Sequence, residues 1–207
     1  ALLDQMIPNI DGAVDALTAG ARMADIGCGT GHALLLLAAE YPASDFVGFD
    51  FSTSAVDIGR RHAEEHGLAN LEFEQCDAAE LDLDREFDFV TSFDAIHDQA
   101  HPDVVLRNIH DALVPDGRYL CVEPKAESAL ADNLADPIAA FNYTISTMHC
   151  MSVSIAGGGE GLGTAWGTDM TTRFLTDAGF VDIELKDVRV DRTSSHFVCR
   201  RPEADHE

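Results

Sequence analysis

Two hydrophobic patterns alternate along the first two thirds of the chain. Short apolar or alternating runs, which are typical of strands, occupy residues 22–25, 45–50, 70–76, 87–92 and 118–123. Stretches with the apolar spacing of helices follow three of them, at residues 33–39, about 53–67 and 102–113. Ser52 or Ser54 is suited to cap the second of these helices, which should end near Gly67. The pattern predicts an α/β fold.

The two ends of the chain continue this organisation. Residues 1–19 have apolar side chains at helical spacing, interrupted by Pro8 and Gly12, which predicts two short helical pieces lying over the ligand cleft. Residues 168–178 predict a helix, followed by strands at 181–190 and 195–200. The chain begins at Ala1 without an initiator methionine, and we expect an upstream region.

The segment from Arg22 to His32, R-M-A-D-I-G-C-G-T-G-H, joins the first strand to the first long helix. Glycine suits a sharp turn with positive φ, or a place where a ligand lies directly against the backbone. A helix that begins immediately afterwards points its free N–H groups back toward that ligand. The segment therefore predicts a strand, a tight loop and a helix with a ligand bound across the loop.

The spacing of the glycines narrows the choice of ligand. A dinucleotide fingerprint, G-x-G-x-x-G, would place its third glycine at residue 32, which is His32. The chain also lacks a Y-x-x-x-K pair, so a nucleotide-dependent oxidoreductase is disfavoured. The observed pattern, D-x-G-x-G-x-G, resembles the S-adenosylmethionine (SAM) loop of class I methyltransferases.

A second motif extends this resemblance. The run L-V-P-D-G-R-Y-L-C-V-E-P is similar to the segment that precedes and forms the fifth strand in that family. Asp116 replaces a family glycine there, and we expect a type I turn to tolerate it. The resemblance covers Met23–Pro124 and, more loosely, Thr168–Arg200. It implies a three-layer αβα, Rossmann-like sheet of seven strands, mostly parallel with an antiparallel last strand.

SAM, with S-adenosylhomocysteine as product, is the cofactor that the resemblance implies. Asp50 ends the second strand, where an acid accepts hydrogen bonds from ribose hydroxyls. The resemblance assigns the adenine to Asp77 and the backbone after it, and the methionine amino group to Phe93 and Asp94. Asp25 would orient that amine or hold the loop. The predicted cofactor-binding residues are Asp25, Gly27, Cys28, Gly29, Gly31, Asp50, Phe51, Ser52, Asp77, Ala78, Phe93 and Asp94.

Two histidines are candidate catalytic residues. Methyl transfer from a sulfonium is an in-line displacement in which the protein supplies alignment and desolvation. A hydroxyl or amine acceptor can also need a general base, for which histidine is suited. His97 follows the fourth strand, at the edge where such sheets hold ligands, and His149 lies further along the chain. Pocket-shaping or structural roles are the alternatives for both.

Residues 125–167 interrupt the family pattern within what we expect to be a single domain, 1–207. A helix over about 136–155 is followed by G-G-G-E-G-L-G, and this combination predicts a lid that selects the substrate. A homodimer face and plain core packing remain as alternatives. Motifs including F-D-A-I-H-D-Q and H-C-M-S-V-S resemble a methyltransferase group that usually has an N-terminal winged-helix domain, absent from this chain.

Composition restricts the partners. The formal net charge is −24 and only two lysines are present, so nucleic acids and anionic membranes are poor partners. We expect a small-molecule acceptor, and the acidic, lysine-poor character suggests a halophilic protein. No membrane span or export signal is recognisable, and the five cysteines form no C-x-x-C pair, so we predict buried thiols in a reducing cytoplasm and no metal site.

These observations leave three functional classes. A small-molecule methyltransferase agrees with most of them. A SAM- or S-adenosylhomocysteine-binding protein without catalysis, acting as a regulator or scaffold, is the second. The oxidoreductase is the third and agrees least with the glycine spacing.

Overall fold

The protein contains a single seven-stranded sheet in its described part. The structure is a computed structural model that describes residues 1–203. The spatial order of the strands is β3-β2-β1-β4-β5-β7-β6. Strands β1 to β5 run parallel, and β7 is antiparallel to both β5 and β6. The predicted fold is therefore confirmed. The strands are β1 (Arg22–Ile26), β2 (Asp45–Asp50), β3 (Leu71–Gln75), β4 (Phe87–Phe93), β5 (Leu113–Pro124), β6 (Val181–Lys186) and β7 (Ser194–Arg200).

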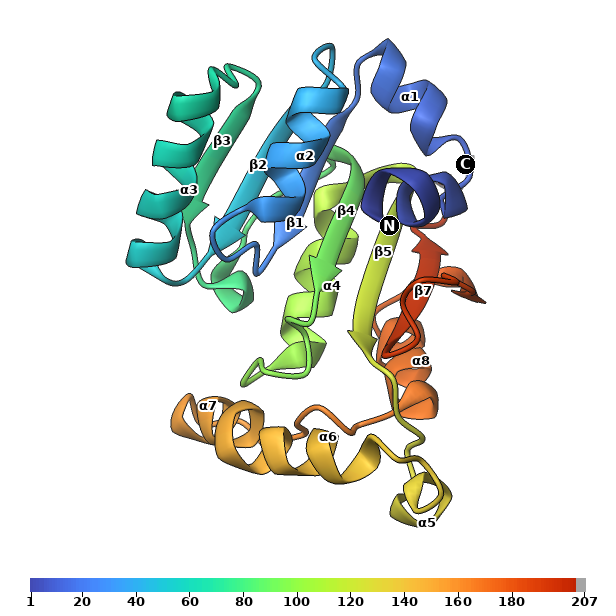
Figure 1. Ribbon diagram of the computed structural model, residues 1–207. Coiled ribbons are helices and arrows are strands. Elements are labelled where there is room, and N and C mark those ends of the chain that lie inside the picture. Colours follow the sequence, from blue (N-terminus) through green and yellow to red (C-terminus); the bar gives the residue numbers. More distant parts are fainter. Residues whose placement is uncertain (204–207) are drawn as a thin grey trace.

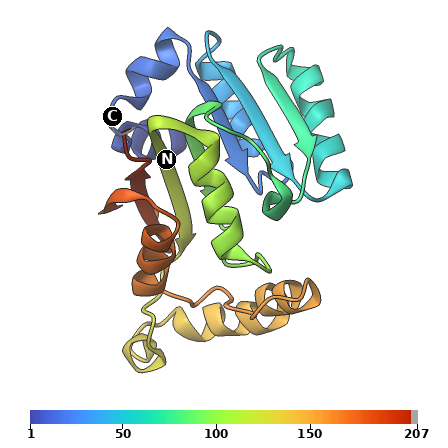
Figure 2. The ribbon, with the colours of Figure 1, turned by 180° about the vertical axis from the view of Figure 1, so that it is seen from behind.

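Helices cover both faces of the sheet (Figures 1 and 2). One face is covered by α1 (Ala13–Ala19), α2 (His32–Glu40) and α3 (Thr53–His66), and the other by α4 (Pro102–Ala112) and α8 (Thr168–Asp177). Alternate residues of β5 enter the two hydrophobic cores, because successive side chains of a strand point to opposite faces. Leu120 and Val122 pack on the α2 side, whereas Tyr119 and Cys121 pack on the α4 side.

The N-terminal segment differs from the prediction. Three short pieces form instead of two: η1 (Leu2–Met6), η2 (Ile7–Asn9) and α1. Four apolar side chains of this segment are buried against the sheet with α2 and α3, which removes them from water: Ile7, Ile10, Ala13 and Leu17. The placement over the cleft is therefore wrong: among the described residues, none from 1 to 19 lines it.

Two details near the end of the sheet also correct the sequence analysis. Asp116 has φ = 64°, the left-handed conformation of a glycine, so the turn is not type I. Aspartate is among the few residues that tolerate this conformation, and Arg118 Nη1 donates to Asp116 Oδ1 at 2.9 Å. Strand β6 stops at Lys186 instead of residue 190, because a turn at 189–190 follows, closed by the bond from Asp191 N to Val188 O.

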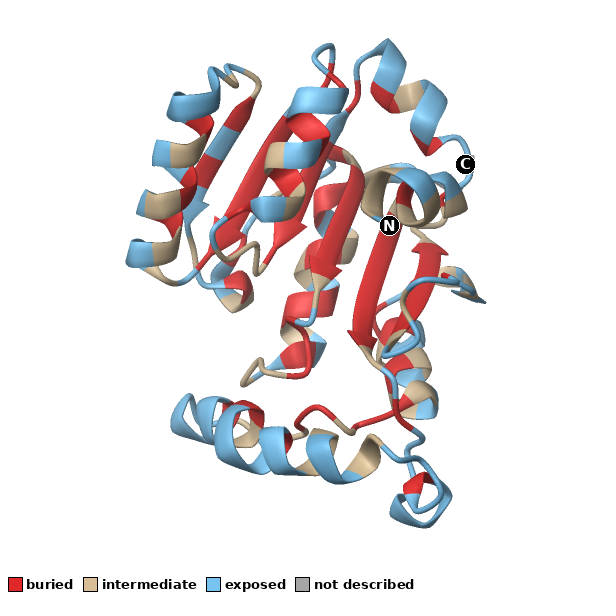
Figure 3. Ribbon diagram, viewed as in Figure 1, coloured by how far each residue is buried: buried red, intermediate tan, exposed pale blue. Residues whose placement is uncertain are grey.

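Residues 125–167 lie below the carboxyl ends of the parallel strands (Figure 1), and residues 139–156 of this insertion form a nearly continuous helix. After α5 (Leu130–Asn133), this helix comprises α6 (Ala139–Ile145), η4 (Ser146–Cys150) and α7 (Met151–Ala156). Its inner face consists of small side chains, Ser146, Cys150 and Ser154. Most of its outer face is exposed (Figure 3), including Phe141 at 62% and Met148 at 76%. Plain core packing is therefore excluded for these side chains.

Candidate functional site

The loop after β1 has the backbone that its three glycines predict. Gly27, Gly29 and Gly31 all have positive φ, between 57° and 76°. A Cβ atom at Gly27 would lie 2.5 Å from Ala95 Cβ, and one at Gly31 would lie 2.2 Å from the Phe73 ring. A Cβ atom at Gly29 would meet nothing within 4 Å. The outer two glycines are thus needed for packing, whereas Gly29 borders open space.

Asp50 connects the end of β2 to this loop. Its Oδ2 accepts a hydrogen bond from Gly29 N and its Oδ1 accepts one from Ser52 N, both at 2.8 Å. Each carboxylate oxygen retains a second lone pair that can accept from a ligand hydroxyl. Ser52 in turn caps α3 by accepting from Ala55 N, as predicted. The carboxylate is therefore held in one orientation at the tip of the strand.

The end of β3 supplies a third acidic side chain. Asp77 Oδ1 accepts from Ala79 N at 2.9 Å and caps the short helix η3 (Ala78–Glu80). Phe51, beside Asp50, is 68% exposed. The tips of β1, β2 and β3 border one cavity of about 500 Å³. Its lining contains seven of the predicted site residues: Gly27, Asp50, Phe51, Asp77, Ala78, Asp94 and His149.

The other predicted site residues are not part of this lining. They are Asp25, Cys28, Gly29, Gly31, Ser52, Phe93 and His97. Asp25 is 2% exposed and accepts a hydrogen bond from Thr91 Oγ1 at 2.8 Å. Burial, with a smaller contribution from the negative charge of Asp50, raises the pKa of Asp25 to about 7. Asp25 is therefore bonded to the neighbouring strand β4 and does not face the cavity.

A buried ion cluster surrounds His97 in the segment after β4. His97 Nδ1 lies 2.6 Å from Glu123 Oε2, and Nε2 lies 3.0 Å from Asp98 Oδ1. Burial alone would lower the pKa of the His97 imidazole, but the bonds and charges of these two carboxylates raise it well above its usual value. Both ring nitrogens are thus engaged.

The sequence analysis gave no role to Glu123, although it is the acid of the V-E-P run at the end of β5. Its Oε1 accepts from Ile96 N at 3.0 Å, so both carboxylate oxygens are bonded within the segment after β4. Asp94 lies in the same segment with φ = 51°, and its N–H donates to Val122 O. Burial, together with the charge of Glu123, raises the pKa of Asp94 to about 6.

The helical insertion forms the opposite wall of the cleft. His149, Val153 and Gly157 face the cavity from successive turns of the helix. Ser154 Oγ donates to Gln99 O at 2.9 Å, which attaches the helix to the segment after β4. The cavity is also lined by residues 98–101, which the sequence analysis did not predict. Their part in the site depends on the position of the insertion helix, which is distant in the sequence.

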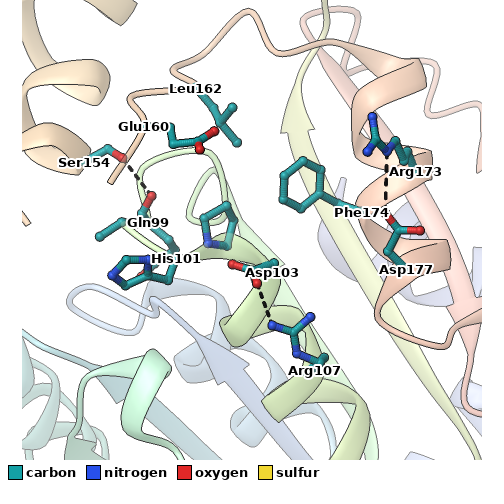
Figure 4. Close-up of a pocket in the computed structure, with 12 residues that line it drawn as sticks. Gln99, His101, Asp103, Arg107, Ser154, Glu160, Leu162, Arg173, Phe174 and Asp177 are labelled. Atoms are coloured by element: carbon teal, nitrogen blue, oxygen red, sulfur yellow. Dashed lines mark hydrogen bonds and ion pairs between the residues drawn. The ribbon is translucent and has the colours of Figure 1, made fainter. Parts of the chain in front are cut away.

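A second cavity, of about 410 Å³, lies on the other side of Gln99 and His101 (Figure 4). Its charged side chains form local ion pairs, Arg107 with Asp103 and Arg173 with Asp177. It contains none of the predicted site residues, all of which lie in the described part of the chain. The first cavity is therefore the better candidate site.

The residues around the first cavity fit SAM. Gly29 leaves open backbone where the cofactor would approach, and Asp50 offers acceptor positions suited to ribose hydroxyls. Four aspartates in the lining favour the positive charge of a sulfonium; they are Asp50, Asp77, Asp94 and Asp98.

None of the described helices has the length and apolar character needed to cross a bilayer.

Comparison with known proteins agrees with this geometry. A family model described as a methyltransferase domain matches residues 17–179. A fatty-acid O-methyltransferase from Mycolicibacterium smegmatis is 32% identical over 128 residues, which are 58% of this chain and 46% of that protein. A demethylmenaquinone methyltransferase from Geobacillus is 25% identical over 193 residues, 88% of this chain and 80% of that protein.

Solved structures share the fold. Phosphoethanolamine N-methyltransferase 2 from Haemonchus contortus, in complex with SAM, superposes with a TM-score of 0.68 at 18% identity, over 90% of this chain and 50% of that one. The chain spans about half the length of several of the curated relatives it matches. Their full activities therefore do not transfer directly to it.

Proposed function

The chain belongs to the methyltransferase-domain family, and from that premise we propose that it transfers a methyl group from SAM to a small-molecule acceptor. The observation that carries the proposal is the convergence of three strand ends, with the loop at Gly27–Gly31, Asp50 and Asp77, around one cavity. Parallel sheets of this kind bind ligands at the carboxyl ends of their strands.

Binding and alignment are the main tasks of this chain's residues in that reaction. When bound, SAM supplies an activated methyl group on a positively charged sulfur. Asp50 would accept from the ribose hydroxyls and Asp77 from the adenine amine, while Phe51 would cover the base. The glycine loop would admit the cofactor against the backbone, while the bond between Asp25 and Thr91 ties the end of β1, which leads into the loop, to β4. Together these contacts would fix the direction of the methyl group relative to the acceptor.

The predicted catalytic histidines differ in their freedom to accept a proton. His97 already has a carboxylate at each ring nitrogen, so it could act as a base only if one of these contacts opened. This geometry favours a positioning role for His97. His149 has an exposed side chain in the cavity lining and is the better placed of the two for proton transfer.

The chemistry of the cleft also suggests the class of acceptor. The M. smegmatis relative is named for a fatty acid and the Geobacillus relative for demethylmenaquinone. In this chain, Val153 and Phe51 offer apolar surface, whereas Asp94 and Asp98 would repel a free carboxylate. We therefore propose a neutral acceptor with a hydroxyl or acidic carbon and an apolar portion.

Calorimetric titration with SAM, S-adenosylhomocysteine and NAD tests the first half of the proposal. We expect the two adenosyl ligands to bind and NAD not to bind; tight binding of NAD alone would overturn the assignment. Turnover is then measured with a neutral hydroquinone, a long-chain fatty acid and a primary amine. Faster methylation of the hydroquinone supports the acceptor class, whereas binding of SAM with no turnover on a broad acceptor panel would favour a silent SAM-binding protein.

A further inference from the structure

A second cluster of ligand-type atoms lies between the segment after β4 and the helical insertion. An imidazole nitrogen of His97, a carboxylate oxygen of Asp98 and Cys150 Sγ all lie within 4.8 Å of one another, and His97 Nε2 is 3.0 Å from Asp98 Oδ1. His97 and Cys150 are buried and Asp98 is half-buried. These atoms come from parts of the chain more than fifty residues apart, so only the folded protein brings them together.

The orientation of His97 suits metal binding. Its Nδ1 contacts Glu123 Oε2 at 2.6 Å, and Glu123 is itself held by Ile96 N. Histidine ligands of metals usually donate their second ring nitrogen to a carboxylate in this way, which fixes the ring and makes the coordinating nitrogen more basic. Glu123 therefore leaves Nε2 of His97 directed toward Asp98 and Cys150.

Two other features are incompletely explained by the protein alone. Asp98 Oδ1 is buried and has no well-aligned hydrogen bond among the described residues, although it lies 3.0 Å from His97 Nε2. A buried carboxylate oxygen in this state is costly unless a cation or donor satisfies it. Cys150 Sγ accepts a hydrogen bond from Thr164 Oγ1 at 3.1 Å, an arrangement that stabilises a thiolate.

We propose that His97, Asp98 and Cys150 bind a divalent transition metal of the zinc class. Imidazole and thiolate ligands select such metals over magnesium or calcium, which prefer oxygen ligands. Three protein ligands leave one tetrahedral position, and Asp98 borders the cavity, so that position faces the cleft. Binding replaces the Nε2 proton of His97 and the thiol proton of Cys150, which pass to solvent.

The charges around the cluster agree with a divalent cation. With the thiolate formed, Cys150, Asp98 and Glu123 would provide three negative charges close to a neutral imidazole. His149 is next to Cys150 in the sequence and exposed in the cavity lining, but it is not among the clustered ligand residues, so the fourth position stays open to the cleft. If the proposed methyltransferase function holds, the open position lies where an acceptor oxygen or sulfur would bind, but the metal site itself does not depend on that function.

Cobalt(II) provides a direct probe, because thiolate coordination to cobalt produces a strong charge-transfer absorption band. The chain is first treated with a chelator, then titrated with cobalt(II) in excess magnesium, which saturates weak sites among the surface carboxylates. We expect one equivalent of cobalt to give the charge-transfer band and one equivalent of zinc to remove it by displacement. No SAM or acceptor is present, so failure here is separate from failure of the proposed function.

Two variants locate the site, and a third is the matched control. Cys150→Ser should abolish the band, and Asp98→Asn should weaken cobalt binding at least tenfold. Cys76→Ser, which alters a different thiol of the same cavity lining, should leave both unchanged. Circular dichroism of the metal-free variants checks that each folds. Absence of the band in the folded parent chain, or its persistence in Cys150→Ser, overturns the proposal.

Discussion

The two walls of the cleft are built in different ways. The wall formed by β1, β2 and β3 is part of the sheet, and its loops are fixed by short contacts such as Asp50 Oδ2 to Gly29 N at 2.8 Å. The wall formed by residues 139–157 is a nearly continuous helix with a narrow buried face and a mostly exposed outer face (Figure 3). We expect the sheet wall to bind the cofactor and the insertion, which is predicted to be a lid, to contact the acceptor.

The largest expected effect comes from closing the open space at Gly29. Gly29→Val should reduce SAM affinity at least a hundredfold, because the branched side chain would fill the open space beside the backbone where the cofactor is expected to lie. The positive φ of this residue would also strain a valine. Gly158→Val is the matched control in the insertion, where the glycine also has positive φ and open surroundings. Calorimetry compares the affinities of the two variants for SAM. An equal loss of SAM affinity in both would contradict the proposal that the sheet wall, and not the insertion, binds the cofactor.

The buried Asp25 should make stability depend on pH in the sheet wall. Its pKa is raised to about 7, so the folded protein retains a proton that the unfolded chain releases above about pH 4. The stabilisation is complete below about pH 4 and is lost progressively as the pH rises from 4 through 7, by about 4 kcal/mol at most. Urea unfolding at pH 4 and pH 8 should show a smaller loss in Asp25→Asn, whose amide oxygen can still accept from Thr91, than in the parent chain; the loss that remains in the variant comes from other groups such as Asp94. A parent chain equally stable at both pH values would contradict the prediction.

Removing the Asp50 carboxylate should weaken cofactor binding by a smaller amount. Asp50→Ala loses two charge-assisted hydrogen bonds to the ribose, an expected cost of about 2–3 kcal/mol. It also releases Gly29 N and Ser52 N, so part of the loss reflects a less ordered loop. Asp50→Asn, which keeps one acceptor oxygen, should lie between the alanine variant and the parent in a SAM titration. Unchanged affinity in Asp50→Ala would place the ribose elsewhere.

The smallest effect on stability is expected on the outer face of the insertion. Phe141→Ser and Met148→Ser remove side chains that are already exposed, so the free energy of unfolding should change by less than about 0.5 kcal/mol. The same variants distinguish a lid from a homodimer face. A dimeric parent and monomeric variants in light scattering would support the homodimer face. A monomer in all cases would exclude the homodimer face and leave the lid as the remaining interpretation of the insertion.

Local pattern was sufficient to predict most of the scaffold and of the sheet wall. The order of strands and helices follows from hydrophobic spacing, and the loop at Gly27–Gly31 follows from residues adjacent in the chain. Asp50 was identifiable because it ends a strand, and parallel strands present their carboxyl ends at one edge. Asp77, which follows the third strand, was assigned by the family resemblance. These features depend on the period of each element and on the few residues that follow it.

Long-range packing decided the rest. Glu123 meets His97, and Cys150 comes close to Asp98, only because β5 and the insertion reach the segment after β4 from distant parts of the chain. The sequence predicted a helix in the insertion but could not tell which of its faces points inward, and the small residues Ser146, Cys150 and Ser154 are the ones that are buried. A periodic pattern determines the face of an element, whereas the identity of its neighbour depends on how the separate elements fill space together.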